Sequence, residues 1–90
     1  MSKLALITGG AKRIGKGIAL SLAENGFDVV IHYSESRKEA EELVTKLKSF
    51  GIATFCIKAN LLKDYEITSL IEETTQTIGK PINLLVNNAS

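Results

Sequence analysis

The segment from Thr8 to Gly17 has the composition and spacing of a loop that binds phosphate. It reads Thr-Gly-Gly-Ala-Lys-Arg-Ile-Gly-Lys-Gly and lies between a short apolar run and a helical pattern that begins near Arg13. The start of a helix exposes unpaired backbone N–H groups and the positive end of the helix dipole, and glycines allow phosphate oxygens to approach the main chain. The segment therefore predicts a site for a phosphate compound.

A nucleoside triphosphate with magnesium is one candidate for this compound. The residues from Gly10 to Lys16 fit the G-x-x-x-x-G-K part of a triphosphate loop, but Gly17 stands where a hydroxyl residue would hold the metal. The third and fourth predicted strands are followed by Asn60 and Asn87, so neither supplies a carboxylate for magnesium. These features argue against triphosphate hydrolysis, and no metal site is predicted.

Apolar and amphipathic segments alternate along the rest of the chain. The predicted strands are 4–7, 28–33, 53–58 and 82–86, and the predicted helices are 13–25, 37–50 and 64–78. Short continuous apolar runs are typical of parallel strands covered on both faces, and a glycine follows each helix as its usual C-terminal cap. Ile14 begins the apolar stripe of the first helix. Ser36 and Glu39 have the spacing of a capping box, and Asp64 is the predicted cap of the third helix.

This alternation predicts an α/β fold, a doubly wound, Rossmann-like parallel sheet of four strands in the order 3-2-1-4 with three helices. Ligands of such sheets bind at the carboxyl ends of the strands, where the strand order reverses. The glycine loop, Asn60 and the segment Asn87 to Ser90 all belong to that edge. The predicted crevice therefore combines residues from three distant parts of the sequence.

Composition limits the remaining function classes. The 90 residues, 44% hydrophobic and 23% charged, suffice for one globular domain, and a net charge of +1 gives no reason to expect nucleic acid or an anionic membrane as a partner. The N-terminus lacks the apolar core of a secretion signal and no run is long enough to span a membrane, so a cytoplasmic location is expected. Cys56 is the single cysteine and is predicted to be a small core residue.

Two segments resemble the short-chain dehydrogenase/reductase family. Residues 8–15 read T-G-x-x-x-R-I-G and resemble the T-G-x-x-x-G-x-G loop of that family, and residues 87–90 read N-N-A-S and resemble its N-N-A-G segment. They occur in the right order on the predicted strands, and the resemblance covers the whole chain. It implies that residues 1–90 form a single, incomplete dinucleotide-binding domain.

Arg13 and Ser90 replace glycines of the family pattern, and both changes are similar to the pteridine reductase branch. In that branch the matching arginine lies beside the cofactor phosphates and the substrate site, which implies the same role for Arg13. The alternative is a surface arginine at a helix start. A cation is unfavourable there unless an anion lies between it and the helix, which favours the functional interpretation.

The end of the second strand favours NADP over NAD. An NAD site would place a carboxylate there for the ribose 2′-hydroxyl, whereas this chain has His32, Tyr33 and Ser34. Glu35 argues mildly against NADP. The residues expected to hold the 2′-phosphate are Ser34, Ser36, Arg37 and, across the crevice, Lys12.

The other expected contacts follow from the resemblance. His32 is placed near the adenosine end, with a hydrogen-bonded structural histidine as its alternative. Asn60 stands where the family usually has an aspartate that accepts from the adenine amino group, and its alternative is an ordinary turn residue. Asn87 and Asn88 are expected to satisfy backbone groups in part. The complete predicted set is Thr8, Gly9, Lys12, Arg13, Ile14, Gly15, His32, Tyr33, Ser34, Ser36, Arg37, Asn60, Leu61, Asn87, Asn88, Ala89 and Ser90.

No catalytic residue is predicted. In the family the catalytic serine and the Tyr-x-x-x-Lys pair follow the part that this chain matches, and neither Tyr33 nor Tyr65 has a lysine four residues later. One hypothesis is therefore the cofactor-binding part of an NADPH-dependent oxidoreductase that transfers a hydride to a carbonyl or a pterin-type imine once a C-terminal half completes it. The other is a non-enzymatic nucleotide-binding or association module. The apolar fourth strand predicts self-association or a companion polypeptide.

Overall fold

The computed structural model describes residues 2–88, with the side chains of Asp64 and Tyr65 excepted. The strands are β1 (Leu4–Thr8), β2 (Asp28–Tyr33), β3 (Thr54–Lys58) and β4 (Leu84–Asn87). The helices are α1 (Arg13–Glu24), α2 (Arg37–Lys48) and α3 (Asp64–Ile78). The expected alternation of strand and helix is confirmed.

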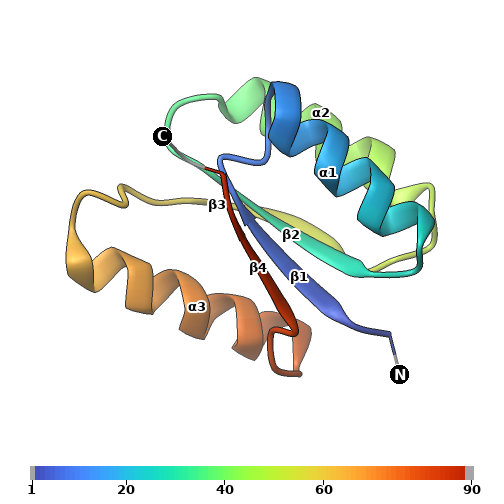
Figure 1. Ribbon diagram of the computed structural model, residues 1–90. Helices are drawn as coiled ribbons and strands as arrows, with labels where there is room; N and C mark the ends of the chain where they lie inside the picture. Colours follow the sequence, from blue (N-terminus) through green and yellow to red (C-terminus); the bar gives the residue numbers. More distant parts are fainter. Residues whose placement is uncertain (1, 89–90) are drawn as a thin grey trace.

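The strands form one parallel sheet in the order β3-β2-β1-β4, as predicted. Helices α1 and α2 cover one face of the sheet and α3 covers the other (Figure 1). The register pairs Ile7 with Ile31 and Thr8 with Asn87, so the strands end together. Their carboxyl ends and the loops that follow therefore meet at one edge of the sheet, which is called the carboxyl edge below.

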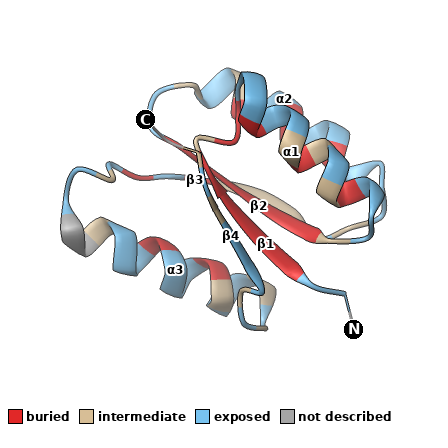
Figure 2. Cartoon of the chain, in the orientation of Figure 1, coloured by how far each residue is buried: buried red, intermediate tan, exposed pale blue. Residues whose placement is uncertain are grey.

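The central strands separate two apolar cores. Side chains of a strand alternate between the two faces of a sheet, so Ile7 and Ile31 pack toward α1 and α2, whereas Leu6 and Val30 pack toward α3 with Leu70. All residues of β1 and β2 are buried, which Figure 2 shows as two red strands at the centre. The carboxyl edge thus rests on the most rigidly packed part of the fold.

Strand β4 is an edge strand among the described strands, because it pairs with β1 alone. Its side chains Leu84 and Leu85 are 38% and 53% exposed although they point to opposite faces. The expected apolar edge is therefore present in the structure (Figure 2). None of the helices in the described part of the chain is long and apolar enough to cross a membrane.

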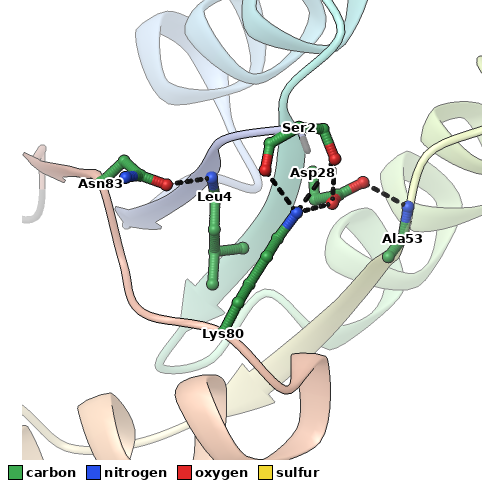
Figure 3. A network of polar contacts seen from close by, with 6 residues as sticks. All are labelled: Ser2, Leu4, Asp28, Ala53, Lys80 and Asn83. Carbon is green, nitrogen blue, oxygen red and sulfur yellow. Dashed lines mark hydrogen bonds and ion pairs between the residues drawn. The ribbon is translucent and has the colours of Figure 1, made fainter.

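Polar residues close the opposite edge of the sheet, called the amino edge below (Figure 3). The Lys80 ammonium lies 2.5 Å from Oδ2 of Asp28, and the two side chains are 12% and 11% exposed. Asp28 also accepts hydrogen bonds from the Ser2 hydroxyl and from the Ala53 backbone N–H, each at 2.8 Å. Burial by itself raises the pKa of Asp28, but the hydrogen bonds from Lys80, Ala53 and Ser2, with the charge of Lys80, lower that pKa below its ordinary value.

Several predicted details of the elements are wrong. The Ser36 side chain makes no capping hydrogen bond to the described helix, because its backbone is not extended and Arg37 N–H bonds to the Glu35 carbonyl instead. Lys63, not Asp64, is the N-cap residue of α3. Ile14 is 71% exposed, since the buried face of α1 runs through Gly15, Ala19 and Ala23, and Ile14 lies to the side of that face.

Several boundaries also differ from the predicted ones. Strand β1 ends at Thr8, α1 at Glu24 and β4 at Asn87, each one residue from the predicted end. Helix α2 ends at Lys48, and Phe50 lies beyond it with 37% exposure. Strand β3 begins one residue later than expected, at Thr54. Strand β4 begins at Leu84. The preceding Asn83 makes two bonds to Leu4, because its N–H donates to the Leu4 carbonyl at 2.8 Å and its Oδ1 accepts from the Leu4 N–H at 2.9 Å.

Candidate functional site

The loop between β1 and α1 is held by the end of β2. Gly9 has a left-handed backbone with φ of 62°, which glycine adopts without steric cost. Its N–H donates to Nδ1 of His32 at 3.1 Å, and the N–H of Gly10 donates to the His32 carbonyl at 3.2 Å. Two successive backbone groups of the loop are thus fixed to a single residue of β2.

Close packing requires glycine at two positions of this loop. A Cβ atom at Gly15 would lie 2.5 Å from the Gly9 carbonyl oxygen and 2.7 Å from Nδ2 of Asn88. At Gly10 it would lie 2.9 Å from Cγ2 of Ile31. Gly17, in contrast, has no described atom within 4 Å of such a Cβ. The glycines at 10 and 15 therefore let the loop fold against the strand ends, and Gly17 does not.

Arg13 adopts a backbone conformation that favours glycine. Its φ of 49° makes it the single non-glycine residue with positive φ in the described chain, at a cost of about 1–2 kcal/mol for an L-residue. This conformation gives a physical reason for the glycine that the family pattern has at this position. The exposed Arg13 side chain stands at the start of α1, beside the loop.

The end of β4 is tied to the same loop. The Thr8 hydroxyl lies 3.1 Å from Oδ1 of Asn87 and accepts a hydrogen bond from the Asn88 backbone N–H at 3.0 Å. Nδ2 of Asn88 donates to the Gly9 carbonyl at 3.1 Å. Asn88 therefore satisfies a backbone group, as expected. Ala89 and Ser90, the other predicted contacts of this segment, lie outside the described residues.

A hollow of about 730 Å³ lies at the carboxyl ends of β2, β3 and β4. It brings together five predicted residues from these strand ends, namely His32, Ser34, Asn60, Leu61 and Asn87. Glu35, the residue that argued mildly against NADP, also lines the hollow. The rest of the wall comes from residues that the sequence did not single out, namely Lys58, Ala59, Leu62 and Ile67. Lys58 ends β3 and could have been found as the last residue of the predicted strand.

The imidazole of His32 is 2% exposed and both ring nitrogens bond to the backbone. Nδ1 accepts from Gly9, and Nε2 lies 2.8 Å from the Ala59 carbonyl oxygen. This matches the structural alternative for His32, a hydrogen-bonded histidine. Although the residue lines the hollow, its polar atoms are already used.

Asn60 forms the turn after β3. Its Oδ1 accepts the Leu62 N–H at 3.0 Å, and its own N–H donates to Oε1 of Glu66 at 2.9 Å. Asn60 therefore has the turn role that the sequence analysis gave as its alternative. Among the side chains that the structure describes, none bonds to the amide NH2 group of Asn60, which could donate to a ligand.

A second hollow of about 490 Å³ lies between α2 and the segment formed by the β1–α1 loop and the start of α1. Its wall carries four cations and two carboxylates, from Lys12, Arg13, Lys16, Lys46, Glu39 and Glu42. Lys12 and Ser34 thus line different hollows, so the structure does not place them in one cavity as the sequence suggested. Ser36 and Arg37 line neither of these two hollows, and Arg37 pairs with Glu41 at 3.3 Å on the exposed surface. Tyr33 is buried in the core beneath α2.

Two further expectations concern thiol and metal chemistry. Cys56 is partly buried against the core, and its burial, reinforced by the negative charge of Glu41, raises the pKa of the thiol. A protonated thiol is a poor nucleophile. No group of three or more His, Cys, Asp or Glu residues in the described part of the chain could hold a metal ion.

Comparison with known proteins agrees with this geometry. The family model for short chain dehydrogenases matches residues 3–90. The 3-oxoacyl-(acyl-carrier-protein) reductase FabG of Staphylococcus epidermidis is 42% identical over 99% of this chain, which spans 36% of that protein. The short-chain dehydrogenase/reductase homolog YusS of Bacillus subtilis is 39% identical over the whole chain, which spans 82% of it. The chain thus has about a third of the length of the first curated relatives.

Solved structures give the same fold. FolM alternative dihydrofolate reductase 1 from Brucella canis, complexed with NADP, is 40% identical with a TM-score of 0.89, over 98% of this chain and 35% of that one. A short chain dehydrogenase from Burkholderia cenocepacia in complex with NADP is 33% identical with a TM-score of 0.93, over 98% and 36%.

Proposed function

The chain belongs to the short-chain dehydrogenase family, and we propose that it is the cofactor-binding part of an NADPH-dependent oxidoreductase. The observation that carries the proposal is the glycine cradle at Gly15, where any Cβ would strike Gly9 and Asn88. A loop that packs this closely brings its main chain to the carboxyl edge, where phosphate groups bind in sheets of this kind. Two related structures were solved with NADP, which supports the choice of cofactor.

The predicted residues can be assigned to the diphosphate, the 2′-phosphate and the adenine of NADPH. The diphosphate would lie at the loop of Gly9 to Gly15, with Arg13 and Lys12 supplying positive charge. The 2′-phosphate would be held by Ser34, Ser36 and Arg37. Among the described residues, the Arg37 guanidinium pairs with Glu41 alone, on the exposed surface. A surface pair of this kind is weak enough to exchange partners. The adenine would enter the hollow of about 730 Å³ beside Asn60 and Leu61.

Remaining contacts of the proposed site lie around the nicotinamide end and the strand ends. They are Thr8, Ile14, Asn87, Asn88, Ala89 and Ser90. The side chains of His32 and Tyr33 are buried and would support the site from the end of β2. When bound, NADPH supplies the hydride. The residues of this chain bind and orient it.

We propose that hydride transfer to a carbonyl or a pterin-type imine requires polypeptide beyond this incomplete domain of 90 residues. The sequence contains no Tyr-x-x-x-Lys pair to move the proton. Arg13 and the similarity to FolM alternative dihydrofolate reductase support a pterin-type substrate, whereas the similarity to FabG supports a 3-oxoacyl substrate.

An association module is the second candidate function, favoured by the open edge of β4. Leu84 and Leu85 are partly exposed on opposite faces, as in a strand that another strand and its helices would cover. Further polypeptide or a second copy would cover this edge. Light scattering of the 90-residue chain should therefore give a mass above that of a monomer, and a monodisperse, cooperatively melting monomer would contradict the association.

Titration of the purified chain with NADPH, NADH and ATP-magnesium tests the cofactor assignment. NADPH should bind most tightly, and Arg37→Ala should remove most of the preference over NADH while leaving NADH affinity unchanged. Tighter binding of ATP-magnesium would refute the dinucleotide assignment of the loop. An unchanged preference in Arg37→Ala would refute the proposed 2′-phosphate site alone.

A further inference from the structure

We infer that His32 is a positioning residue. Its two ring nitrogens hold Gly9, in the loop between β1 and α1, at a fixed separation from Ala59, in the wall of the hollow of about 730 Å³ where adenine is proposed to bind. The inference rests on the proposed function for its ligand, NADPH. The arrangement itself consists of contacts within the chain, which can be measured without any ligand.

The two ring contacts define one tautomer. The Gly9 N–H is a donor and can only be paired with an unprotonated Nδ1, at 3.1 Å. The Ala59 carbonyl oxygen is an acceptor and can only be paired with a protonated Nε2, at 2.8 Å. The ring is therefore neutral with its proton on Nε2. No polar atom of the imidazole is left for a ligand, so any hydrogen-bonding effect of the His32 ring on binding must pass through Gly9 and Ala59.

These two partners belong to the segments that the proposed cofactor spans. Gly9 opens the phosphate loop, and its carbonyl accepts from Nδ2 of Asn88 at the end of β4. Ala59 directly precedes Asn60 and lines the large hollow. The chain of contacts Ala59, His32, Gly9 and Asn88 thus crosses the carboxyl edge from β3 to β4. A single planar ring fixes the separation between the loop and the hollow.

Other side chains at this position would not preserve both contacts. The preceding residues of β2, Val29 to Ile31, are aliphatic and fully buried, and an aliphatic residue at 32 would leave the Gly9 N–H and the Ala59 carbonyl unpaired. Unpaired buried backbone groups are unfavourable, so the loop would move away to regain hydrogen bonds with water. The loop would then no longer be preformed for phosphate.

Two amide variants separate the contacts. In His32→Asn the side-chain amide lies near the position of Nδ1 and can keep the bond from Gly9, whereas in His32→Gln it lies near Nε2 and can keep the bond to Ala59. We expect His32→Gln to speed hydrogen exchange of the Gly9 amide and to weaken NADPH binding, each by at least about tenfold. His32→Asn should retain most of the Gly9 protection and lose clearly less affinity. Asp28→Asn, at the amino edge, is the control for a general loss of stability.

Nitrogen NMR of the wild-type ring tests the same inference without a substitution. It should report the neutral Nε2–H tautomer. A ring protonated on Nδ1, or equal NADPH affinity of wild type and a folded His32→Gln, would overturn the inference. Wild-type protein that does not bind NADPH would refute the proposed function instead, whereas the tautomer and the Gly9 exchange rate would still decide whether the ring clamps the loop.

Discussion

The two edges of the sheet use their polar residues in opposite ways. At the amino edge, Asp28, Lys80 and Ser2 bond mainly to one another and close the surface. At the carboxyl edge, His32 and Asn88 bond to loop backbone, and a hollow of about 730 Å³ stays open beside them. The first arrangement holds strands together, whereas the second shapes main chain that a ligand can approach. The comparison predicts that stability and cofactor affinity can be changed separately.

Gly15→Ala should have the largest effect on the carboxyl edge. The new Cβ would lie 2.5 Å from the Gly9 carbonyl oxygen, so the loop or α1 must move. We expect a loss of at least about 2 kcal/mol in the free energy of unfolding and roughly 100-fold weaker NADPH binding, about 3 kcal/mol. Chemical denaturation and fluorescence titration measure the two changes.

Gly17→Ala is the matched control for this substitution. Gly17 has open space around it, and alanine in a helix interior is more favourable than glycine by about 0.5–1 kcal/mol. The variant should therefore be slightly more stable with unchanged NADPH affinity. Equal changes in the free energy of unfolding and in NADPH affinity for Gly15→Ala and Gly17→Ala would contradict the requirement for glycine at position 15.

Asp28→Asn should act on the amino edge and change stability alone. It leaves the Lys80 ammonium, 12% exposed, without its carboxylate, and breaking such a pair costs about 2–4 kcal/mol at this degree of burial. NADPH affinity of the folded protein should stay within about twofold, a difference of about 0.4 kcal/mol. A large drop in NADPH affinity in Asp28→Asn would show that the two edges are coupled.

Glu41→Gln is the control for a solvent-exposed ion pair. It removes the pair with Arg37 and should lower the free energy of unfolding by less than about 0.5 kcal/mol.

The pH dependence of stability should reveal the same carboxylate. The pKa of Asp28 is lowered in the folded state, so its contribution is complete above the pKa of the unfolded carboxyl, about 4, and is lost as the pH falls through the folded pKa. Wild type should therefore exceed Asp28→Asn by a constant margin at neutral pH and by a shrinking margin in acid. Denaturation at a series of pH values measures the margin, and a margin that grows in acid would contradict the lowered pKa.

Arg13→Gly should produce small changes of opposite sign in folding and binding. Glycine removes the strain of a φ of 49° and should raise the free energy of unfolding by up to about 1 kcal/mol. The loss of the guanidinium should weaken NADPH binding about fivefold, or about 1 kcal/mol. Arg13→Lys keeps the charge and the strain, so it separates the two effects. Unchanged affinity in Arg13→Gly would show that Arg13 is the surface residue of the alternative interpretation.

The sequence was sufficient for the strand order and for the edge that carries the hollow. Short apolar runs and glycines after each helix are local signals, and the rule for parallel crossovers converts them into a topology. The loop pattern also singled out Gly15, but not its close packing against Gly9 and Asn88. Ile14 was misplaced because the apolar stripe suggested a face through Ile14, whereas the small residues Gly15, Ala19 and Ala23 form the buried face of α1.

The contacts that distinguish the two edges could not be predicted. Lys80 and Asp28 are 52 residues apart, and their pairing depends on how the turn after α3 meets β2. Likewise, His32 reads as a lone histidine until the fold brings Gly9 to one ring nitrogen and Ala59 to the other. Such pairings depend on tertiary geometry at the level of single atoms.

Mapping of amide chemical shifts during titration with NADPH tests the central claim most directly, because it reports on both edges at once. The account predicts shifts in the loop from Gly9 to Gly15, at 32–37 and 59–62, and at Asn87 and Asn88. The amides of Ser2, Asp28 and Lys80 should remain unchanged. Shifts confined to the amino edge, or none at saturating NADPH, would contradict the assignment of the carboxyl edge as the cofactor site.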